Sequence, residues 1–274
     1  MTDKTYWLQA PDEQVAAQVG DRVSAAVLLV NGTRRWFLSQ QADWSHYPQA
    51  TGAAHRRVSQ LLYEHGIANV IQPLFGFDLL ERGQEYLELA LQQGLASLAG
   101  DAYLAWYRQA DIRVIFYGNW RDTLSSLGFH ALRGQLDGVV DATAGHARRR
   151  LLVGLFADRP WDDILALSRR CCTGRELVEG YYGLPLPPVD LVIGSGQPAV
   201  WDVPLLDTNR ASLYFMQAPT FFMSRETLRL ILYDHLFERS ADDQVTALPA
   251  DGFAWMPHAV LGVGQRTALG WIPV

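Results

Sequence analysis

Two adjacent arginines, Arg34 and Arg35, follow the first apolar run of the sequence and a single glycine, Gly32. Guanidinium groups bind phosphate oxygens, and backbone N–H groups at a helix start add to such a site. Asn31 precedes the glycine, and its amide can orient water or a phosphate oxygen but cannot act as a base at neutral pH. The segment therefore indicates either a phosphate site or a solvated basic turn, because arginine pairs also occur elsewhere in the chain.

Polar and aromatic side chains also follow the later apolar runs. Asp78 comes after Asn69–Phe75 and is either a helix cap or an active-site carboxylate. Gly194-Ser195-Gly196 follows the fifth run but lacks the third glycine of a dinucleotide site. A cleft with arginines at one end and aromatic rings at the other would suit a lipid-like phosphate. Aromatic rings also stabilise a carbocation, by about 2 kcal/mol for each desolvated ring. The alternative is that these rings fill the core. The rings beside the predicted strand ends are Trp36, Phe37, Trp44, Tyr47, Phe75, Phe77, Tyr117, Trp120 and Trp201.

Short apolar runs alternate with helical patterns along the chain. This alternation predicts one α/β domain, residues 1–274, with a mostly parallel central sheet flanked by helices. Ligands bind beyond the carboxyl ends of the strands in such sheets, so we expect the side chains above to lie at one edge. The predicted strands are Val23–Val30, Asn69–Phe75, Ile112–Gly118, Leu151–Ala157, Val189–Ile193 and Ser212–Phe215. The predicted helices are Tyr47–Gly66, Leu79–Ala99, Asp101–Ala110, Trp161–Arg170, Arg175–Tyr181 and Ser224–Glu238.

Composition excludes several classes of protein. Of 274 residues, 49% are apolar and 19% charged, which is typical of a globular chain, and the net charge of -6 argues against a general nucleic-acid binder. Lys4 is the only lysine, so the rest of the chain offers neither a P-loop lysine nor a Schiff-base lysine. Cys171 and Cys172 are adjacent, which disfavours a disulfide between them. With no secretory or membrane-spanning apolar run, we expect a soluble cytoplasmic protein.

Several blocks of the sequence together match one known family. Residues Gly32–Phe37 read Gly-Thr-Arg-Arg-Trp-Phe. With the blocks below, they resemble the cis-prenyltransferase fold of the undecaprenyl diphosphate synthases. Within that fold they resemble the bacterial diterpene synthases of the kolavelool and tuberculosinol type. The other matching blocks are Glu64–Ile67, Asp78–Gly83, Phe116–Gly118, Glu179–Gly183, Pro204–Leu206, Ser212–Phe215, Ile231–His235 and Gly262–Gly264.

The resemblance implies an enzyme that releases diphosphate from a bicyclic diterpenyl diphosphate, of the kolavenyl or halimadienyl (tuberculosinyl) type. Water would then capture the cation and give an alcohol such as kolavelool or tuberculosinol. Mg²⁺ and a homodimer are implied by the resemblance alone, and the metal ligands are left open. The expected catalytic residues are Asn31, Arg34, Arg35, Tyr47 and Asp78, and the expected substrate-binding residues are Gly32, Thr33, Trp36, Phe75, Phe77, Tyr117, Trp201 and Asp202.

The chain also departs from the chain-elongating members of this family. Gly194–Ala199 lacks the arginines of their isopentenyl diphosphate site, and Ser212 stands where they have a metal-binding glutamate. Asn31 replaces the aspartate of the first strand, so Asp78 and Asp202 are the candidates for its role. Two alternatives remain: a non-catalytic, partner-binding subunit of the same fold and, less favoured, a chain-elongating enzyme.

Overall fold

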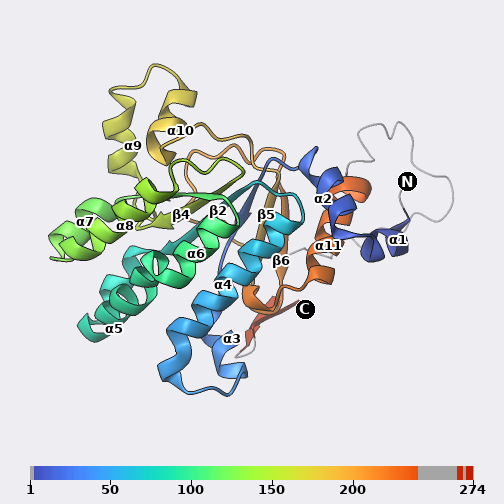
Figure 1. The fold of residues 1–274 in the computed structure, drawn as a ribbon, viewed down its shortest axis with the longest axis horizontal. Coiled ribbons are helices and arrows are strands. Elements are labelled where there is room, and N and C mark those ends of the chain that lie inside the picture. Colours follow the sequence, from blue (N-terminus) through green and yellow to red (C-terminus); the bar gives the residue numbers. More distant parts are fainter. Residues whose placement is uncertain (1–2, 240–263, 268–269, 274) are drawn as a thin grey trace.

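The centre of the molecule is a sheet of six parallel strands in the order β3-β4-β2-β1-β5-β6 (Figure 1). The structure is a computed structural model that describes residues 3–239, 264–267 and 270–273. It confirms the predicted parallel α/β fold and all of the predicted strands, although β1 is shorter than Val23–Val30. The strands are β1 (Ala25–Leu28), β2 (Asn69–Phe75), β3 (Ile112–Tyr117), β4 (Arg149–Leu155), β5 (Leu191–Ser195) and β6 (Ser212–Met216). A separate antiparallel pair joins β7 (Gly264–Thr267) to β8 (Gly270–Pro273). Gly262 and Val263 of the Gly262–Gly264 block lie outside the described residues.

Eleven α-helices are found in the described part of the chain. Five of them, α1, α2, α3, α7 and α8, have no counterpart among the predicted helices. The predicted helix Leu79–Ala99 is wrong as a continuous element. Gly83, at a φ of 93°, separates a 3-10 helix from α5, and π and 3-10 turns follow. The helices are α1 (Lys4–Gln9), α2 (Asp12–Gly20), α3 (Thr33–Ser39), α4 (Tyr47–Glu64), α5 (Gln84–Leu89), α6 (Asp101–Gln109), α7 (Trp120–Ser126), α8 (His130–Thr143), α9 (Trp161–Ser168), α10 (Gly174–Tyr182) and α11 (Arg225–Tyr233).

The two faces of the sheet pack against different sets of helices. Along β1 the side chains alternate, so that Ala26 and Leu28 join one apolar cluster and Ala25 and Val27 the other. The larger cluster includes residues of α1, α2, α4, α6, α7, α8 and α11, whereas the smaller one lies under α9 and α10 (Figure 1). Within the described residues, no helix is both long and apolar enough to cross a bilayer.

The sheet order brings the ends of β1 and β5 together. β1 pairs with β2 on one side and β5 on the other, so the chain reverses its direction of winding at this pair. Crevices form where two neighbouring strands send their connections to different sides. Asn31 follows β1, and its side-chain amide donates a hydrogen bond of 3.3 Å to the carbonyl oxygen of Ser195 at the end of β5. The segments that follow β1 and β5 are therefore in contact.

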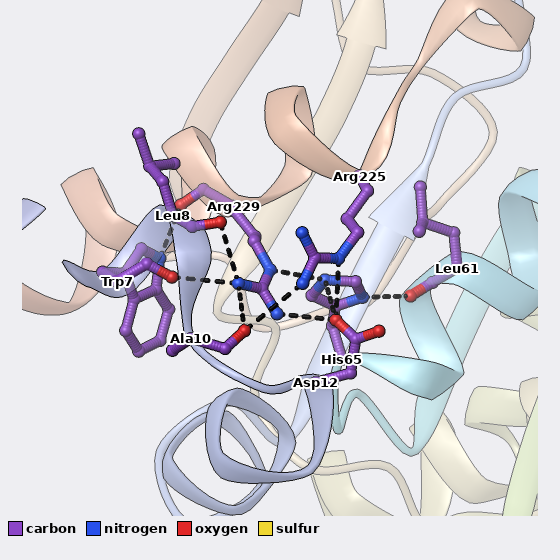
Figure 2. Close-up of polar contacts among 8 residues, drawn as sticks. All are labelled: Trp7, Leu8, Ala10, Asp12, Leu61, His65, Arg225 and Arg229. Atoms are coloured by element: carbon purple, nitrogen blue, oxygen red, sulfur yellow. Dashed lines mark hydrogen bonds and ion pairs between the residues drawn. The ribbon is translucent and has the colours of Figure 1, made fainter. Parts of the chain in front are cut away.

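A buried arginine holds the N-terminal segment to the body of the protein (Figure 2). The side chain of Arg229, on α11, is 0% exposed. Its guanidinium donates hydrogen bonds to the carbonyl oxygens of Trp7, Leu8 and Ala10, at 2.7 to 3.0 Å, and to the carboxylate of Asp12 at 2.6 Å. These carbonyls lie where α1 ends and α2 begins, so one side chain satisfies the acceptors of that junction.

A second contact of this arginine explains the state of a buried histidine. His65 donates a hydrogen bond from Nδ1 to the carbonyl of Leu61 at 2.8 Å, so its Nε2 accepts from Arg229 at 3.3 Å (Figure 2). Burial and the neighbouring guanidinium lower the pKa of His65. Its neighbour Gly66 has a φ of 90°, and a Cβ there would overlap the carbonyl oxygen of Ala16 on α2. Glycine is therefore required where α4 ends against α2.

A fully enclosed histidine on α4 makes stability depend on pH. His55 bonds the hydroxyl of Tyr103 at 2.8 Å and Oε1 of Gln72 at 2.6 Å, and burial lowers its pKa to about 4. The unfolded chain binds this proton near pH 6.5 and the folded chain does not. The free energy of unfolding should therefore fall by about 3 kcal/mol as the pH is lowered from 6.5 to about 4.

Urea unfolding at several pH values tests this. His55→Gln should show a shallower pH slope than the wild type, whereas His130→Gln, which removes an exposed imidazole, should keep the wild-type slope. His65 also favours the neutral form and adds to the slope of every variant. An unchanged slope in His55→Gln would contradict the assignment.

Candidate active site

The turn after β1 is built around Gly32, the residue that precedes α3. Gly32 has a φ of 76°, and a Cβ there would lie 2.9 Å from the ring of Pro219 and 3.1 Å from Nη2 of Arg35. Only glycine combines this backbone conformation with so little space. The same distance shows that the guanidinium of Arg35 lies over the turn, next to the start of α3.

The two arginines of this turn have no partner within the described parts of the chain. Arg34 is exposed and Arg35 is partly exposed, and neither side chain donates a hydrogen bond or forms an ion pair there. Most other arginines near strand ends are paired; Arg82, for instance, binds Asp78. Two guanidinium groups thus lie beside the start of α3 with no protein partner among the described residues, and guanidinium groups are suited to bind phosphate oxygens.

Asn31 closes the turn with both ends of its amide. Its Oδ1 accepts a hydrogen bond of 2.7 Å from the backbone N–H of Gly32, and its Nδ2 donates to Ser195 at 3.3 Å. An aspartate would place an oxygen against the Ser195 carbonyl and lose that donor. The amide is therefore matched to its surroundings, and the geometry gives it a positioning role at this turn.

Aromatic side chains form one wall beside the arginine turn. Tyr47, the first residue of α4, shares a hydrogen bond of 2.9 Å with the hydroxyl of Thr33 on α3. The rings of Phe37, Trp44 and Tyr47 lie within 5.3 Å of one another, centroid to centroid. Burial raises the pKa of Tyr47, so its hydroxyl stays neutral. The ring of Trp36 packs edge-on against Phe221.

An ion pair links this wall to the end of β2. Asp78 binds the guanidinium of Arg82, which also donates to the hydroxyl of Tyr86 at 3.3 Å. The charges of Arg34 and Arg82 both act on the hydroxyl of Tyr47. Asp78 is thus a paired carboxylate rather than the helix cap that its position also allowed.

A second group of residues lies where β4 and β5 end. A cavity of about 260 Å³ there is lined by Asp158, Trp201 and Asp202 with neighbouring alanine, proline and valine residues. Burial, followed by the charges of Asp158 and Asp78, raises the pKa of Asp202 to about 6. A Cβ added to Gly76 would lie 3.2 Å from both Oδ2 of Asp158 and Oδ1 of Asp78, so this cavity lies next to the Asp78–Arg82 pair.

The remaining predicted residues support these two groups. Phe77 packs against Phe156, and its backbone N–H donates to Asp158 at 2.9 Å. The ring of Phe75 lies against Gly94. Tyr117 is fully buried, and its hydroxyl donates to the backbone carbonyl of Asp202 at 3.0 Å, so it holds the loop in place from beneath.

The structure therefore gathers the predicted residues into two neighbouring groups. Gly32, Thr33, Arg34, Arg35 and Tyr47 surround the arginine turn. Asp78, Trp201 and Asp202 lie toward the cavity. The following three residues belong to the same region and were missed by the sequence analysis: Arg82, Asp158 and Tyr181. Asp158 follows β4 as Asp78 follows β2, so the strand-end rule applied to that segment would have found it.

The described residues contain no preformed cluster of metal ligands. No group of three or more His, Cys, Asp or Glu side chains between residues 3 and 239 is arranged to hold a metal ion. At the turn itself, Oδ1 of Asn31 is neutral and already accepts a hydrogen bond from Gly32. Mg²⁺ prefers charged carboxylate oxygens.

A larger cavity, of about 560 Å³, lies at the opposite edge of the sheet. Its lining includes Ala68, just before β2, and Arg149, the first residue of β4. These positions mark the amino ends of the strands, so this cavity is separate from the arginine turn.

Comparison with known proteins relates the chain to two named enzymes. No protein-family model matches it. It is 35% identical to tuberculosinyl adenosine transferase of Mycobacterium tuberculosis (strain CDC 1551 / Oshkosh) over 265 residues, covering 89% of this chain and 88% of the relative. It is 24% identical to (+)-kolavelool synthase of Herpetosiphon aurantiacus over 277 residues, covering 96% of this chain and 90% of the relative.

A solved structure confirms the fold. A probable undecaprenyl diphosphate synthase from Campylobacter jejuni superimposes with a TM-score of 0.60 at 15% identity. The superposition covers 78% of this chain and 95% of the other.

Proposed function

We propose, because the chain belongs to the cis-prenyltransferase-like family of tuberculosinyl adenosine transferase and (+)-kolavelool synthase, that it ionises a bicyclic diterpenyl diphosphate. The allylic C–O bond breaks, its electron pair leaves with diphosphate, and water captures the cation to give a diterpene alcohol such as kolavelool or tuberculosinol. The substrate would be of the kolavenyl or halimadienyl (tuberculosinyl) type. The proposal includes the homodimer that the resemblance implies.

The unpaired arginines at the Gly32 turn are the observation that carries this proposal. Negative charge grows on the leaving diphosphate as the C–O bond breaks, and preorganised cationic donors stabilise that charge. Nη2 of Arg35 lies over the turn, and Arg34 is the preceding residue in the first turn of α3, so we expect both to bind the same anion. A purely partner-binding subunit has no need for such a pair.

The aromatic wall supports the proposal because its rings would stabilise the carbocation that remains after diphosphate leaves. Trp44 and Tyr47 adjoin the arginines, with Phe37 buried behind them, and ring faces attract a cation by about 2 kcal/mol each when water is excluded. The neutral hydroxyl of Tyr47 and the amide of Asn31 are the polar groups that would position the attacking water. The proton released by that water would pass to a carboxylate such as Asp202.

Product analysis tests the proposal directly. The purified chain would be incubated with kolavenyl, halimadienyl and geranylgeranyl diphosphates, with and without Mg²⁺. Diphosphate and products would be measured by colorimetry and mass spectrometry. Release of diphosphate with a C20 alcohol from a bicyclic substrate supports the proposal, and no turnover of either bicyclic substrate refutes it. Elongated products from added isopentenyl diphosphate would instead identify a chain-elongating enzyme.

Asn31→Asp is expected to lower activity rather than restore it. The carboxylate would repel the Ser195 carbonyl and add a negative charge beside Arg35, where diphosphate binds. We expect KM for the diterpenyl diphosphate to rise about tenfold, which corresponds to about 1.4 kcal/mol of lost binding. Steady-state kinetics measure this. A gain in kcat would show instead that the amide impairs an ancestral site.

Transfer to an acceptor other than water is the second candidate activity. The name of the Mycobacterium relative specifies transfer to adenosine. The observation in this chain that favours a larger acceptor is the cavity beside Asp202.

A further inference from the structure

Two arginines lie side by side at the edge of the sheet where the strands begin, opposite to the arginine turn. Arg113 on β3 and Arg150 on β4 are partners in the parallel register of these two strands. Neighbouring strands are about 4.8 Å apart, so the two side chains leave the sheet next to each other. Asn69, the first residue of β2, is in turn the register partner of Arg150. The three residues therefore form one row across this edge.

The row lies on the face of the sheet that packs against α9 and α10. Side chains alternate between the two faces along a strand. Ile115 and Leu152, two residues after Arg113 and Arg150, belong to the smaller apolar cluster, so both arginines leave the sheet on its side. Arg149 alternates to the other face, where it lines the cavity of about 560 Å³. The arginine pair is therefore separate from that cavity.

Neither charge of this pair is neutralised within the part of the chain that the structure describes. Both arginines are partly buried, and neither forms an ion pair there. The guanidinium of Arg113 also makes no hydrogen bond, and that of Arg150 makes one long bond, 3.5 Å from Nη1 to Oδ1 of Asn69. Arg149 differs, because its guanidinium donates to the carbonyl oxygen of Ala110 at 3.1 Å.

Two like charges in this arrangement oppose folding. Like charges on facing residues of neighbouring strands destabilise a sheet, and partial burial reduces the screening by water and salt. The row offers only one long acceptor, Oδ1 of Asn69, for two cations. An anion between the guanidinium groups would remove the repulsion, and phosphate suits the position because its oxygens can accept from both groups.

We propose that Arg113 and Arg150 form a second anion site, whose ligand is a phosphate group. The two guanidinium groups supply the donors, because Nδ2 of Asn69 already donates to the carbonyl oxygen of Ser24 at 2.7 Å. The phosphate group is that of inorganic phosphate or of free diphosphate, and either one neutralises the pair and stabilises the folded chain. Neither arginine takes part in the proposed ionisation at the other edge of the sheet.

Thermal unfolding tests the charge argument. All variants carry Arg35→Ala, so that phosphate bound through Arg35 does not contribute. Without phosphate, Arg113→Met should raise the melting temperature by about 1 to 3 °C, because it removes the repulsion and keeps a similar side-chain volume. Sodium phosphate, compared with sodium chloride at equal ionic strength, should raise the melting temperature of the parent but barely that of Arg113→Met. Arg108→Met, which removes an exposed arginine of α6, should respond like the parent.

Titration calorimetry measures the affinity of the site in the same Arg35→Ala background. Inorganic phosphate and diphosphate are the two probes, and the one that binds more tightly identifies the source of the phosphate group. Arg113→Met should weaken binding about 10- to 100-fold, as the loss of a hydrogen bond to a charged group does. Arg150→Met is a second variant with the same expected loss, and circular dichroism checks that both variants are folded.

Saturable binding that both methionine variants lose, and that Arg108→Met keeps, supports the site. Three results would overturn it: no saturable binding of either probe, equal affinity with and without Arg113, or equal stabilisation by chloride and phosphate. These measurements use no diterpenyl diphosphate, so their outcome is independent of whether the arginine turn ionises such a substrate.

Discussion

Arg35→Ala is expected to lower kcat/KM for a diterpenyl diphosphate by about 10²- to 10³-fold while the protein stays folded, the loss typical of removing one donor to developing negative charge. The guanidinium lies over the Gly32 turn and has no partner among the described residues. Its removal therefore breaks no structural contact and removes charge only from the anion site. Diphosphate release and circular dichroism of the same preparation measure the two effects.

A matched arginine elsewhere controls for the change in net charge. Arg108 is exposed on α6 and has no hydrogen bond or ion pair within the described residues, so Arg108→Ala should retain wild-type kinetics. Arg35→Lys should recover part of the loss, because an ammonium supplies charge without the two-pronged geometry. Normal turnover by Arg35→Ala would show that the diphosphate binds elsewhere.

Arg229→Met is expected to be the most destabilising single change, at about 3 kcal/mol or more of unfolding free energy. The methionine fills a similar volume but takes four hydrogen bonds from this junction. The carbonyl of Leu8 loses its donor, those of Trp7 and Ala10 keep only long contacts of 3.4 and 3.3 Å, and Asp12 loses its closest arginine. The N-terminal helices α1 and α2 would then lose their attachment to α11.

Arg225 offers a matched comparison at the same carboxylate. Both arginines bind Oδ1 of Asp12, at 2.6 Å for Arg229 and 2.8 Å for Arg225, but their side chains are 0% and 46% exposed. Arg225→Met should therefore cost only about 1 kcal/mol or less, since solvent screens exposed ion pairs. Urea unfolding of both variants measures the difference, and equal losses would show that burial does not set the strength of this contact.

The parallel sheet could be predicted from the sequence because each strand is a short apolar run bounded by polar or turn residues. A strand buried on both faces requires such a run, whatever else surrounds it. The helices that were missed lack this kind of signal. α8 contains two glycines, Gly134 and Gly138, and α1 is only Lys4–Gln9, so their stability comes from packing rather than from local propensity.

The candidate site also contains one part that local sequence determines and one part that it does not. Asn31 to Arg35 are neighbours in sequence, so their shared turn is determined locally by Gly32 and its positive φ. Asp158, Tyr181 and Asp202 come from three separate segments and meet only through the pairing of β4 with β2 and of β5 with β1. No local pattern encodes that meeting.

By itself, then, the sequence determined the parallel sheet, the arginine turn after its first strand and the aromatic character of the surroundings, since each depends on residues close together in the chain. Only the tertiary structure decided that Asp78 is paired while Asp202 is not, and that Arg229 is buried. The charge state and availability of a side chain depend on what distant segments place beside it, through desolvation and hydrogen bonding, and these contacts exist only once the chain has folded.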